Sequence, residues 1–329
     1  MARHGHIVRT QDVAAINPVA NRVAWQITLR LSQLIQNLWG GVRVEIEDFP
    51  QLDGPVLFTM NHSHYFDFLQ SRAAMDHQEG VRTASFVKYR AFQNRVDGAY
   101  MRLMGNIPIA SRGYLISADF AQVNGRKPDE AEYRVLRDHV DGAGPLPDEP
   151  TFQALLDGPR EVLGLSFEPG QTPYREMIGA CYRQAMATTL SQARQVIDAG
   201  HSLHIYPEGL YSSRLSQGRT GAIQIAVGLG LPIVPVGFSG MNDLFHDKCI
   251  LAHRSGTLKL RFGEPYRVNR PELENLTPFD WRDEEDLGPV LEEETHKLMW
   301  KINALLDPSC QWGEDQVGDG LKGVARFFA

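Results

Sequence analysis

Apolar segments typical of strands alternate with segments of helical periodicity along most of the chain, and this alternation constrains the fold more than any other feature. Strands are predicted at residues 42–49, 54–62, 83–89, 202–209, 231–240 and 256–268, and helices at 66–75, 173–199 and 284–306. Chains of this kind fold into mostly parallel sheets covered by helices. We therefore predict an α/β fold with a largely parallel mixed sheet flanked by helices.

Changes in composition and periodicity along the chain predict three regions. Residues 1–40 are expected to form an N-terminal segment with a helix, residues 41–306 the α/β domain, and residues 307–329 a C-terminal tail. Within the domain, residues 114–170 are rich in proline, glycine and acidic side chains, which indicates a partly helical insertion over the surface. Such insertions act as lids or substrate-selecting loops, or are solvated loops without chemical consequence, and the sequence leaves both open.

The helix expected at residues 20–39 is amphipathic, with its apolar side chains on one broad side and a Gly40-Gly41 pair at its end. One interpretation is a helix that packs on the protein's own core. The other is an interfacial helix whose apolar side lies in lipid. The tail, which ends in "LKGVARFFA", has the same two options.

Composition excludes several classes of protein. The net charge of −7 argues against a broad basic face of the nucleic-acid-binding type, so no nucleic-acid partner is expected. The three cysteines form no close pair, which argues against a disulfide scaffold or a zinc ribbon and fits a reducing compartment. The N-terminus lacks a secretory signal core, and no segment is typical of a spanning helix. We expect a cytoplasmic protein with at most surface contact at the inner membrane face.

The stretch "TMNHSHYFDF" at residues 59–68 places polar side chains in an apolar run, where they must be hydrogen-bonded, ligated or used. His62 and Asp67 fall between the end of a strand and the start of a helix, where α/β folds build their sites. There the carboxylate of Asp67 can reach one ring nitrogen of His62 and raise the basicity of the other, making His62 a general base. Without a suitable G-x-S-x-G elbow, the nucleophile would be the substrate's own alcohol.

Two other interpretations of this stretch stay open on the pattern alone. His62 and His64, two residues apart, could point the same way and bind a metal together with Asp67, as in a metal-dependent hydrolase. Alternatively, the histidine is simply hydrogen-bonded in a core.

Three further stretches follow in order: "GNIPIASR" at residues 105–112, "HIYPEGLYSSR" at 204–214 and "LPIVPV" at 231–236. With them the sequence resembles the glycerolipid acyltransferase family, the PlsC-type lysophospholipid acyltransferases. Members of that family carry N-H-x4-D, then G-x-x-x-I-x-R, then F-P-E-G-T-R-S and an apolar V-P-I-V-P-V strand. The lysine-containing "FVKYRAF" and the glycine of "SQGRTG" fit as well, and the resemblance spans roughly residues 40–265.

The resemblance implies an O-acyltransferase of phospholipid biosynthesis. Such an enzyme moves a fatty acyl group from acyl-CoA or acyl-carrier protein to a hydroxyl of a lysophospholipid or glycerol-phosphate-like acceptor, with no further cofactor and no metal. It implies His62 as base and Asp67 as its orienting acid. Glu208 would help to hold the acceptor, with Gly209 beside it, although turn geometry alone explains a glycine there. Lys88 or backbone N–H groups would stabilise the oxyanion.

The sequence departs from the family pattern where phosphate recognition is expected. The family's Thr-Arg is Leu210-Tyr211 here, the next arginine is Arg214, and Arg112 lies one residue further along than usual. Phosphate would then be bound by Arg112, Arg214 or Arg219, or the acceptor lacks a phosphate. Besides the metal-dependent hydrolase, a non-catalytic protein that binds acyl lipids on the same scaffold remains an alternative.

Overall fold

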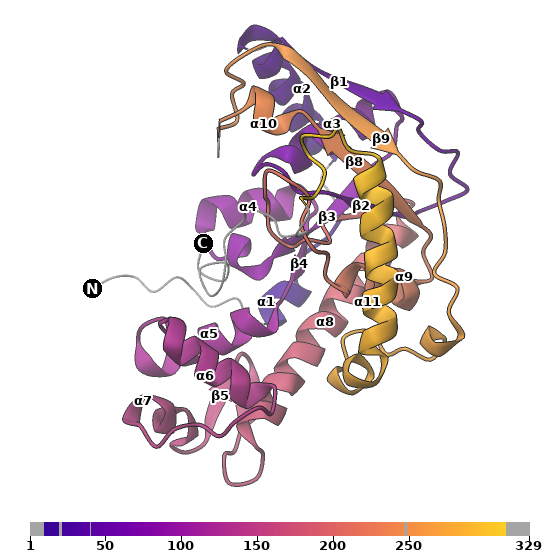
Figure 1. Cartoon of the computed structure of the whole chain (residues 1–329). Helices are drawn as coiled ribbons and strands as arrows, with labels where there is room; N and C mark the ends of the chain where they lie inside the picture. Colours follow the sequence, from indigo (N-terminus) through magenta and orange to yellow (C-terminus); the bar gives the residue numbers. More distant parts are fainter. Residues whose placement is uncertain (1–9, 20–21, 40, 247–248, 314–329) are drawn as a thin grey trace.

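A computed structural model of the chain (Figure 1) describes residues 10–19, 22–39, 41–246 and 249–313. Its centre is a seven-stranded sheet in the order β1-β9-β8-β2-β7-β3-β4. Neighbouring strands run parallel except at the β8/β9 pair, so the predicted largely parallel mixed sheet is confirmed. The strands are β1 (Val42–Glu47), β2 (Leu57–Met60), β3 (Thr83–Lys88), β4 (Ile107–Ile109), β7 (Ser202–Ile205), β8 (Ile233–Ser239) and β9 (Gly256–Phe262).

Helices connect the strands and cover the sheet. The predicted helices at residues 66–75, 173–199 and 284–306 are confirmed as α3, α8 and α11. The helices are α1 (Thr10–Ala14), α2 (Arg22–Trp39), α3 (Asp67–Gln78), α4 (Arg95–Leu103), α5 (Arg112–Asn124), α6 (Glu130–Val140), α7 (Pro150–Gln153), α8 (Tyr174–Asp198), α9 (Gly221–Leu229), α10 (Met241–Leu244) and α11 (Trp281–Ala304), with short 3₁₀ turns η1 (Tyr89–Phe92), η2 (Ala154–Leu156) and η3 (Pro271–Leu273).

The two faces of the sheet are buried by different helices. On one face, α8, α9 and α11 pack against apolar side chains such as Leu57, Phe86 and Leu203. On the other, α3 and α10 pack near β2, β8 and β9 through residues that include Phe58 and Phe238. Burial on both faces explains why the central strands have continuous apolar runs and no alternation.

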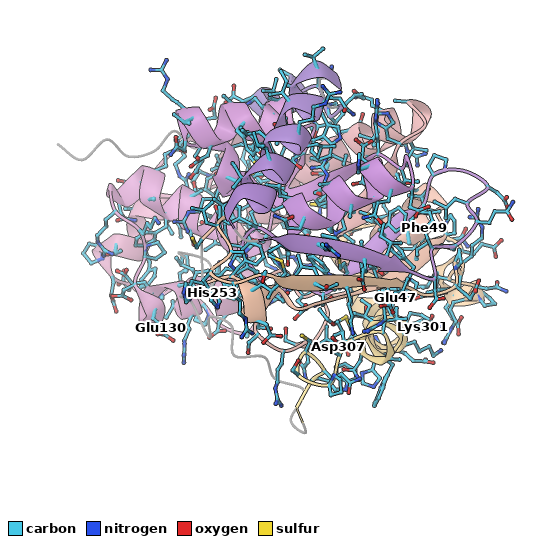
Figure 2. All side chains as sticks on the ribbon, turned by 90° about the horizontal axis from the view of Figure 1, so that it is seen from above. Glu47, Phe49, Glu130, His253, Lys301 and Asp307 are labelled. Atoms are coloured by element: carbon cyan, nitrogen blue, oxygen red, sulfur yellow. The ribbon has the colours of Figure 1, made fainter. Side chains whose placement is uncertain are left out.

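Ion pairs tie one edge of the sheet to the end of α11. Arg261 on β9 donates to Glu47 on β1 at 2.7 Å and to Asp307, just after α11, at 2.8 Å. Figure 2 shows Glu47 and Asp307 on the same side of the molecule, away from His253 and Glu130. The predicted tail at residues 307–329 begins here, and its last residues, 314–329, lie outside the described part of the chain.

The segment expected to be an insertion is folded and shares one apolar core with α1, η1 and α8. After α5 it forms α6, α7 and a hairpin of β5 (Arg160–Val162) and β6 (Leu165–Phe167), at the end of the molecule opposite β1 and β9 (Figure 1). The carboxylate of Asp119, fully buried, binds both terminal nitrogens of Arg160 and accepts from the hydroxyl of Tyr174 at 2.8 Å. The segment is therefore ordered by a buried ion pair, and its apolar side chains pack against α8.

Helix α2 packs on the protein with one side and leaves the apolar side chains of its other side exposed. Trp25 is buried, donates from Nε1 to Asp76 on α3 at 3.0 Å, and lies 4.4 Å from the guanidinium of Arg72. The other side carries four apolar side chains that are at least half exposed, namely Val23, Ile27, Leu31 and Leu34. In the described residues no helix is both long and apolar enough to span a membrane.

Candidate active site

The polar stretch of the sequence lies at the carboxyl end of β2, in the centre of the sheet. Asn61, the first residue after the strand, holds this end to the neighbouring strand β8. Its side chain donates to the carbonyl of Phe238 at 2.9 Å and accepts from the N–H of the same residue at 2.7 Å. Helix α3 begins at Asp67, so the residues between form a short turn with its ends fixed by β2 and α3.

His62 and Asp67 are in direct contact across this turn. The Nδ1 atom of His62 lies 2.8 Å from Oδ2 of Asp67, as the sequence predicted, and the same oxygen accepts from the N–H groups of Ser63 and His64 at 3.0 and 3.3 Å. The carboxyl group is fully buried, whereas the imidazole remains 19% exposed. With Nδ1 engaged by the carboxylate, Nε2 is the nitrogen available for proton transfer.

The carboxyl group of Asp67 is held in its ionised form. Burial by itself raises its pKa, but the charge and hydrogen bond of His62, the hydroxyl of Tyr206 and the amide of His64 together lower that pKa below the ordinary value. An ionised partner at Nδ1 selects one imidazole tautomer and stabilises the imidazolium that forms when Nε2 takes up a proton.

Tyr206 is a third member of this cluster that sequence reasoning missed. Its hydroxyl donates to Oδ1 of Asp67 at 2.6 Å, and its ring stacks on the imidazole of His62 with centroids 4.1 Å apart. Burial and the neighbouring carboxylate raise the pKa of Tyr206 well above its ordinary value, so the hydroxyl is a neutral donor. The available signal was a hydroxyl-bearing side chain placed directly after a buried strand.

Glu208 holds the backbone of the turn in place. Its Oε1 accepts from the N–H of His62 at 2.8 Å, and its Oε2 accepts from the N–H and hydroxyl of Ser216, both at 2.8 Å. The carbonyl of His62 in turn accepts from the N–H of Ser212 at 2.9 Å. Because both carboxylate oxygens bind groups of this chain, the geometry favours a role in fixing the turn over the predicted contact with an acceptor.

Burial raises the pKa of Glu208 to about 7 from 4.5, against the opposing hydrogen bonds of His62 and Ser216. Folding therefore favours the protonated form, and the stability that this group contributes is complete below pH 4.5 and lost as the pH rises through about 7. Glu208→Gln removes the titration. We expect the free energy of unfolding of the wild type minus that of Glu208→Gln, both from urea unfolding, to decrease across that window. The wild type minus Glu264→Gln, a variant at an exposed side chain, is the control and should show no such decrease. A difference for Glu208→Gln that does not vary with pH contradicts this assignment.

The predicted basic residues Lys88, Arg112 and Arg214 lie on different segments of the chain. Lys88 is exposed at the carboxyl end of β3, and Arg214 is exposed with its carbonyl accepting from the hydroxyl of Ser212. Arg112 begins α5, where its guanidinium lies 3.7 Å from Asp141 and 5.4 Å from the ring centre of Tyr182. These contacts place Arg112 between Asp141, at the end of α6, and Tyr182 on α8.

Gly209 forms the turn after Glu208 with φ at +71°, a conformation that favours glycine. The Nε and Cδ atoms of Arg219 lie 3.6 Å from the position that a side chain at Gly209 would occupy. Among the three arginines considered for phosphate binding, Arg219 therefore covers the turn that holds His62.

Aromatic side chains border the exposed side of His62. Tyr211 meets the imidazole edge-on at 5.7 Å, and Tyr65, which is 48% exposed, meets Tyr211 at 6.5 Å. A cavity of about 400 Å³ lies elsewhere, beside α4, with Arg95 and Arg102 among its lining residues and no residue of this cluster.

His64 does not share a ligand site with His62. Its Nε2 lies 3.0 Å from the carbonyl of His246, and its Nδ1 accepts from the N–H of Phe66 at 3.2 Å. Over the described ranges, no three His, Cys, Asp or Glu side chains are grouped to hold a metal ion. The geometry therefore gives no support to chelation by His62, His64 and Asp67 together.

Comparison with known proteins supports the resemblance seen in the motifs. A family model described as Acyltransferase matches residues 177–239, from α8 through β7 and the turn of Glu208 to the end of β8. No curated protein matches the chain. Among solved structures, the 1-acyl-sn-glycerophosphate (LPA) acyltransferase PlsC from Thermotoga maritima is similar at 13% identity with a TM-score of 0.40, covering 83% of this chain and 79% of that one. That similarity is too distant to carry over a function.

Fold and site together define an α/β protein with a His–Asp pair at the carboxyl end of a central parallel strand. The match to the Acyltransferase model confirms, over residues 177–239, the resemblance to an acyltransferase family that the sequence motifs indicated. This segment contains Tyr206 and Glu208, whereas His62 and Asp67 lie outside it. Hydrogen bonds from the N–H of His62 to Glu208 and from Tyr206 to Asp67 connect the His–Asp pair to the segment.

Proposed function

We propose that the protein is an O-acyltransferase that moves a fatty acyl group from acyl-CoA or acyl-carrier protein to a hydroxyl of a lysophospholipid or glycerol-phosphate-like acceptor. The observation that carries this proposal is the 2.8 Å contact between Nδ1 of His62 and an ionised, buried Asp67. The match to the Acyltransferase model over the adjoining strands supports the same reaction. Phospholipid biosynthesis is the process in which such a transfer belongs.

In the proposed reaction the acceptor hydroxyl gives its proton to Nε2 of His62 and attacks the thioester carbonyl. The tetrahedral intermediate then collapses, the C–S bond breaks, and the imidazolium returns the proton to the departing thiolate. Asp67 stabilises the imidazolium throughout because its carboxylate is fixed on Nδ1. Lys88, at the carboxyl end of β3, is the candidate side chain for stabilising the oxyanion.

The experiment that tests this proposal is a transfer assay with labelled acyl-CoA and labelled acyl-carrier protein. Each donor is offered with lysophospholipids, glycerol phosphate and non-phosphorylated alcohols, and the ester product is separated from free fatty acid. We expect labelled ester with at least one acceptor. If every combination releases only free fatty acid, and does so only with added metal, the result favours the metal-dependent hydrolase. Binding of the acyl donor without turnover favours the acyl-lipid-binding protein.

We further propose that the protein is cytoplasmic, works at the inner membrane face and contacts the lipid through α2. Val23, Ile27, Leu31 and Leu34 recur at helical spacing and form an exposed apolar stripe, while the opposite side of the helix is anchored on the protein. An amphipathic helix lying in the interface buries such a stripe among lipid headgroups and acyl chains.

Vesicle sedimentation tests this contact. Replacing Ile27 and Leu31 together by glutamate is expected to weaken binding to phospholipid vesicles at least about tenfold, because two apolar side chains lose their burial in lipid. Trp300→Gln, at a side chain that is 50% exposed on α11, provides the matched control and should bind as the wild type does. Equal binding of all three proteins would show that α2 does not contact the membrane.

A further inference from the structure

Part of the interface between α3 and the sheet is polar, although it lies in the interior. Helix α3 buries Asp67, Ser71 and Arg72 on this side, and the strands facing it bury Ser85 and His204. Apolar side chains normally fill such a layer, so buried polar groups here require hydrogen bonds and act as a network.

The register of strands β3 and β7 accounts for this layer of buried polar side chains. Ser85 on β3 and His204 on β7 are direct partners in the parallel ladder, and the hydroxyl of Ser85 lies 3.0 Å from Nδ1 of His204. The terminal nitrogens of Arg72 donate to Asn106 at 2.8 Å, to the carbonyl of Met104 at 3.2 Å and to the carbonyl of Thr83. Its Nε is buried without a hydrogen-bond partner among the described residues. The layer thus extends from α2, through Arg72, to the strand that leads into Tyr206.

Tyr206 joins this layer to the His–Asp pair. Its ring meets His204 edge-on at 4.6 Å and stacks on His62, while its hydroxyl reaches the Asp67 oxygen that His62 does not use. One carboxylate is therefore held from both ends, by an imidazole at Oδ2 and a phenol at Oδ1.

We infer that Tyr206 is a positioning residue for acyl transfer, whose hydroxyl fixes the Asp67 carboxylate so that Oδ2 stays directed at Nδ1 of His62. The inference rests on the proposed function for its catalytic meaning. A carboxylate held at only one of its oxygens can rotate about its Cβ–Cγ bond, and a hydrogen bond to Oδ1 restricts that rotation. Stacking of the phenol on the imidazole restricts the other partner.

The groups that face this cluster allow a pH test. Burial lowers the pKa of His204 to about 3, so this ring is neutral at ordinary pH. Burial also lowers the pKa of Arg72, to about 10, so its guanidinium stays charged. Glu208, whose pKa is raised to about 7, accepts from the backbone N–H of His62. Removal of the Tyr206 hydroxyl leaves the contacts of Glu208 unchanged.

Tyr206→Phe removes the hydroxyl and keeps the stacked ring. We expect kcat for acyl transfer to fall about tenfold with little change in KM, because one hydrogen bond to an ionised group is lost. Without this donor more negative charge on Asp67 faces the imidazole, so the acidic limb of the kcat/KM profile should move to higher pH. Tyr266→Phe is the matched control, since that hydroxyl is buried without a hydrogen-bond partner among the described residues.

A titration of labelled histidine by NMR separates this inference from the proposed function, because it requires no activity. The His62 signal is assigned by its loss in His62→Gln. The pH midpoint of this signal should move to higher pH in Tyr206→Phe and remain unchanged in Tyr266→Phe. In the wild type a protected hydroxyl proton of Tyr206 is also expected, which tests the contact even if the variant folds poorly. An unchanged midpoint in a folded variant, or an unprotected hydroxyl proton in the wild type, overturns the inference.

Discussion

Asp67→Asn is expected to lower kcat for acyl transfer by about 10³-fold while the protein still folds. The amide has the shape of the carboxylate but carries no charge, and its NH₂ group cannot accept from Nδ1 of His62. The imidazole is then held in the wrong tautomer, and the imidazolium loses its stabilising partner. The N–H groups of Ser63 and His64 also lose an anionic acceptor at Oδ2.

The loss of these hydrogen bonds is expected to cost about 1–3 kcal/mol of stability, so the variant should be compared at a temperature where it is folded. Asp76→Asn is the matched control, because Asp76 lies on the same helix and accepts from Trp25 of α2 instead of contacting His62. It should keep wild-type kcat. If Asp67→Asn keeps more than about a tenth of the wild-type rate, Asp67 does not act as the orienting acid.

The contact between His62 and Asp67 could be predicted from sequence because it is local. A buried strand that ends at one residue and a helix that begins a few residues later leave little freedom for the turn between them. Parallel strands also place their carboxyl ends at one edge of the sheet, so the motif after β2 and the motif after β7 are expected to meet there. Both expectations needed only the order of elements.

The hydrogen-bond partners of Glu208 could not be obtained in that way. The sequence shows a carboxylate at a strand end, where binding of an acceptor hydroxyl is the natural hypothesis. Its actual partners are the backbone of His62 and the side chain of Ser216, and the first is remote in sequence. Whether a carboxylate faces a substrate or its own backbone depends on the path of the adjoining loop, which residue types do not determine.

For α2, too, the sequence predicts the element but not its surroundings. The pattern over residues 20–39 predicts a helix and an apolar side, yet it does not say what covers that side. In the structure Trp25 and Leu29 pack on Met104, while Ile27 and Leu31 are exposed. A helix that is apolar around most of its circumference can meet two surroundings, and only the position of its neighbours separates them.

The measurement that tests the central claim most directly is the rate at which His62→Ala forms labelled ester from acyl-CoA and an acceptor of the wild type. Alanine removes the only group proposed to take the acceptor proton, so we expect a loss of about 10⁴-fold or more. His253→Ala, at an exposed histidine outside the cluster, should retain wild-type activity. Both variants should unfold near the wild-type midpoint. Ester formation by folded His62→Ala at the wild-type rate would contradict the assignment of His62 as general base.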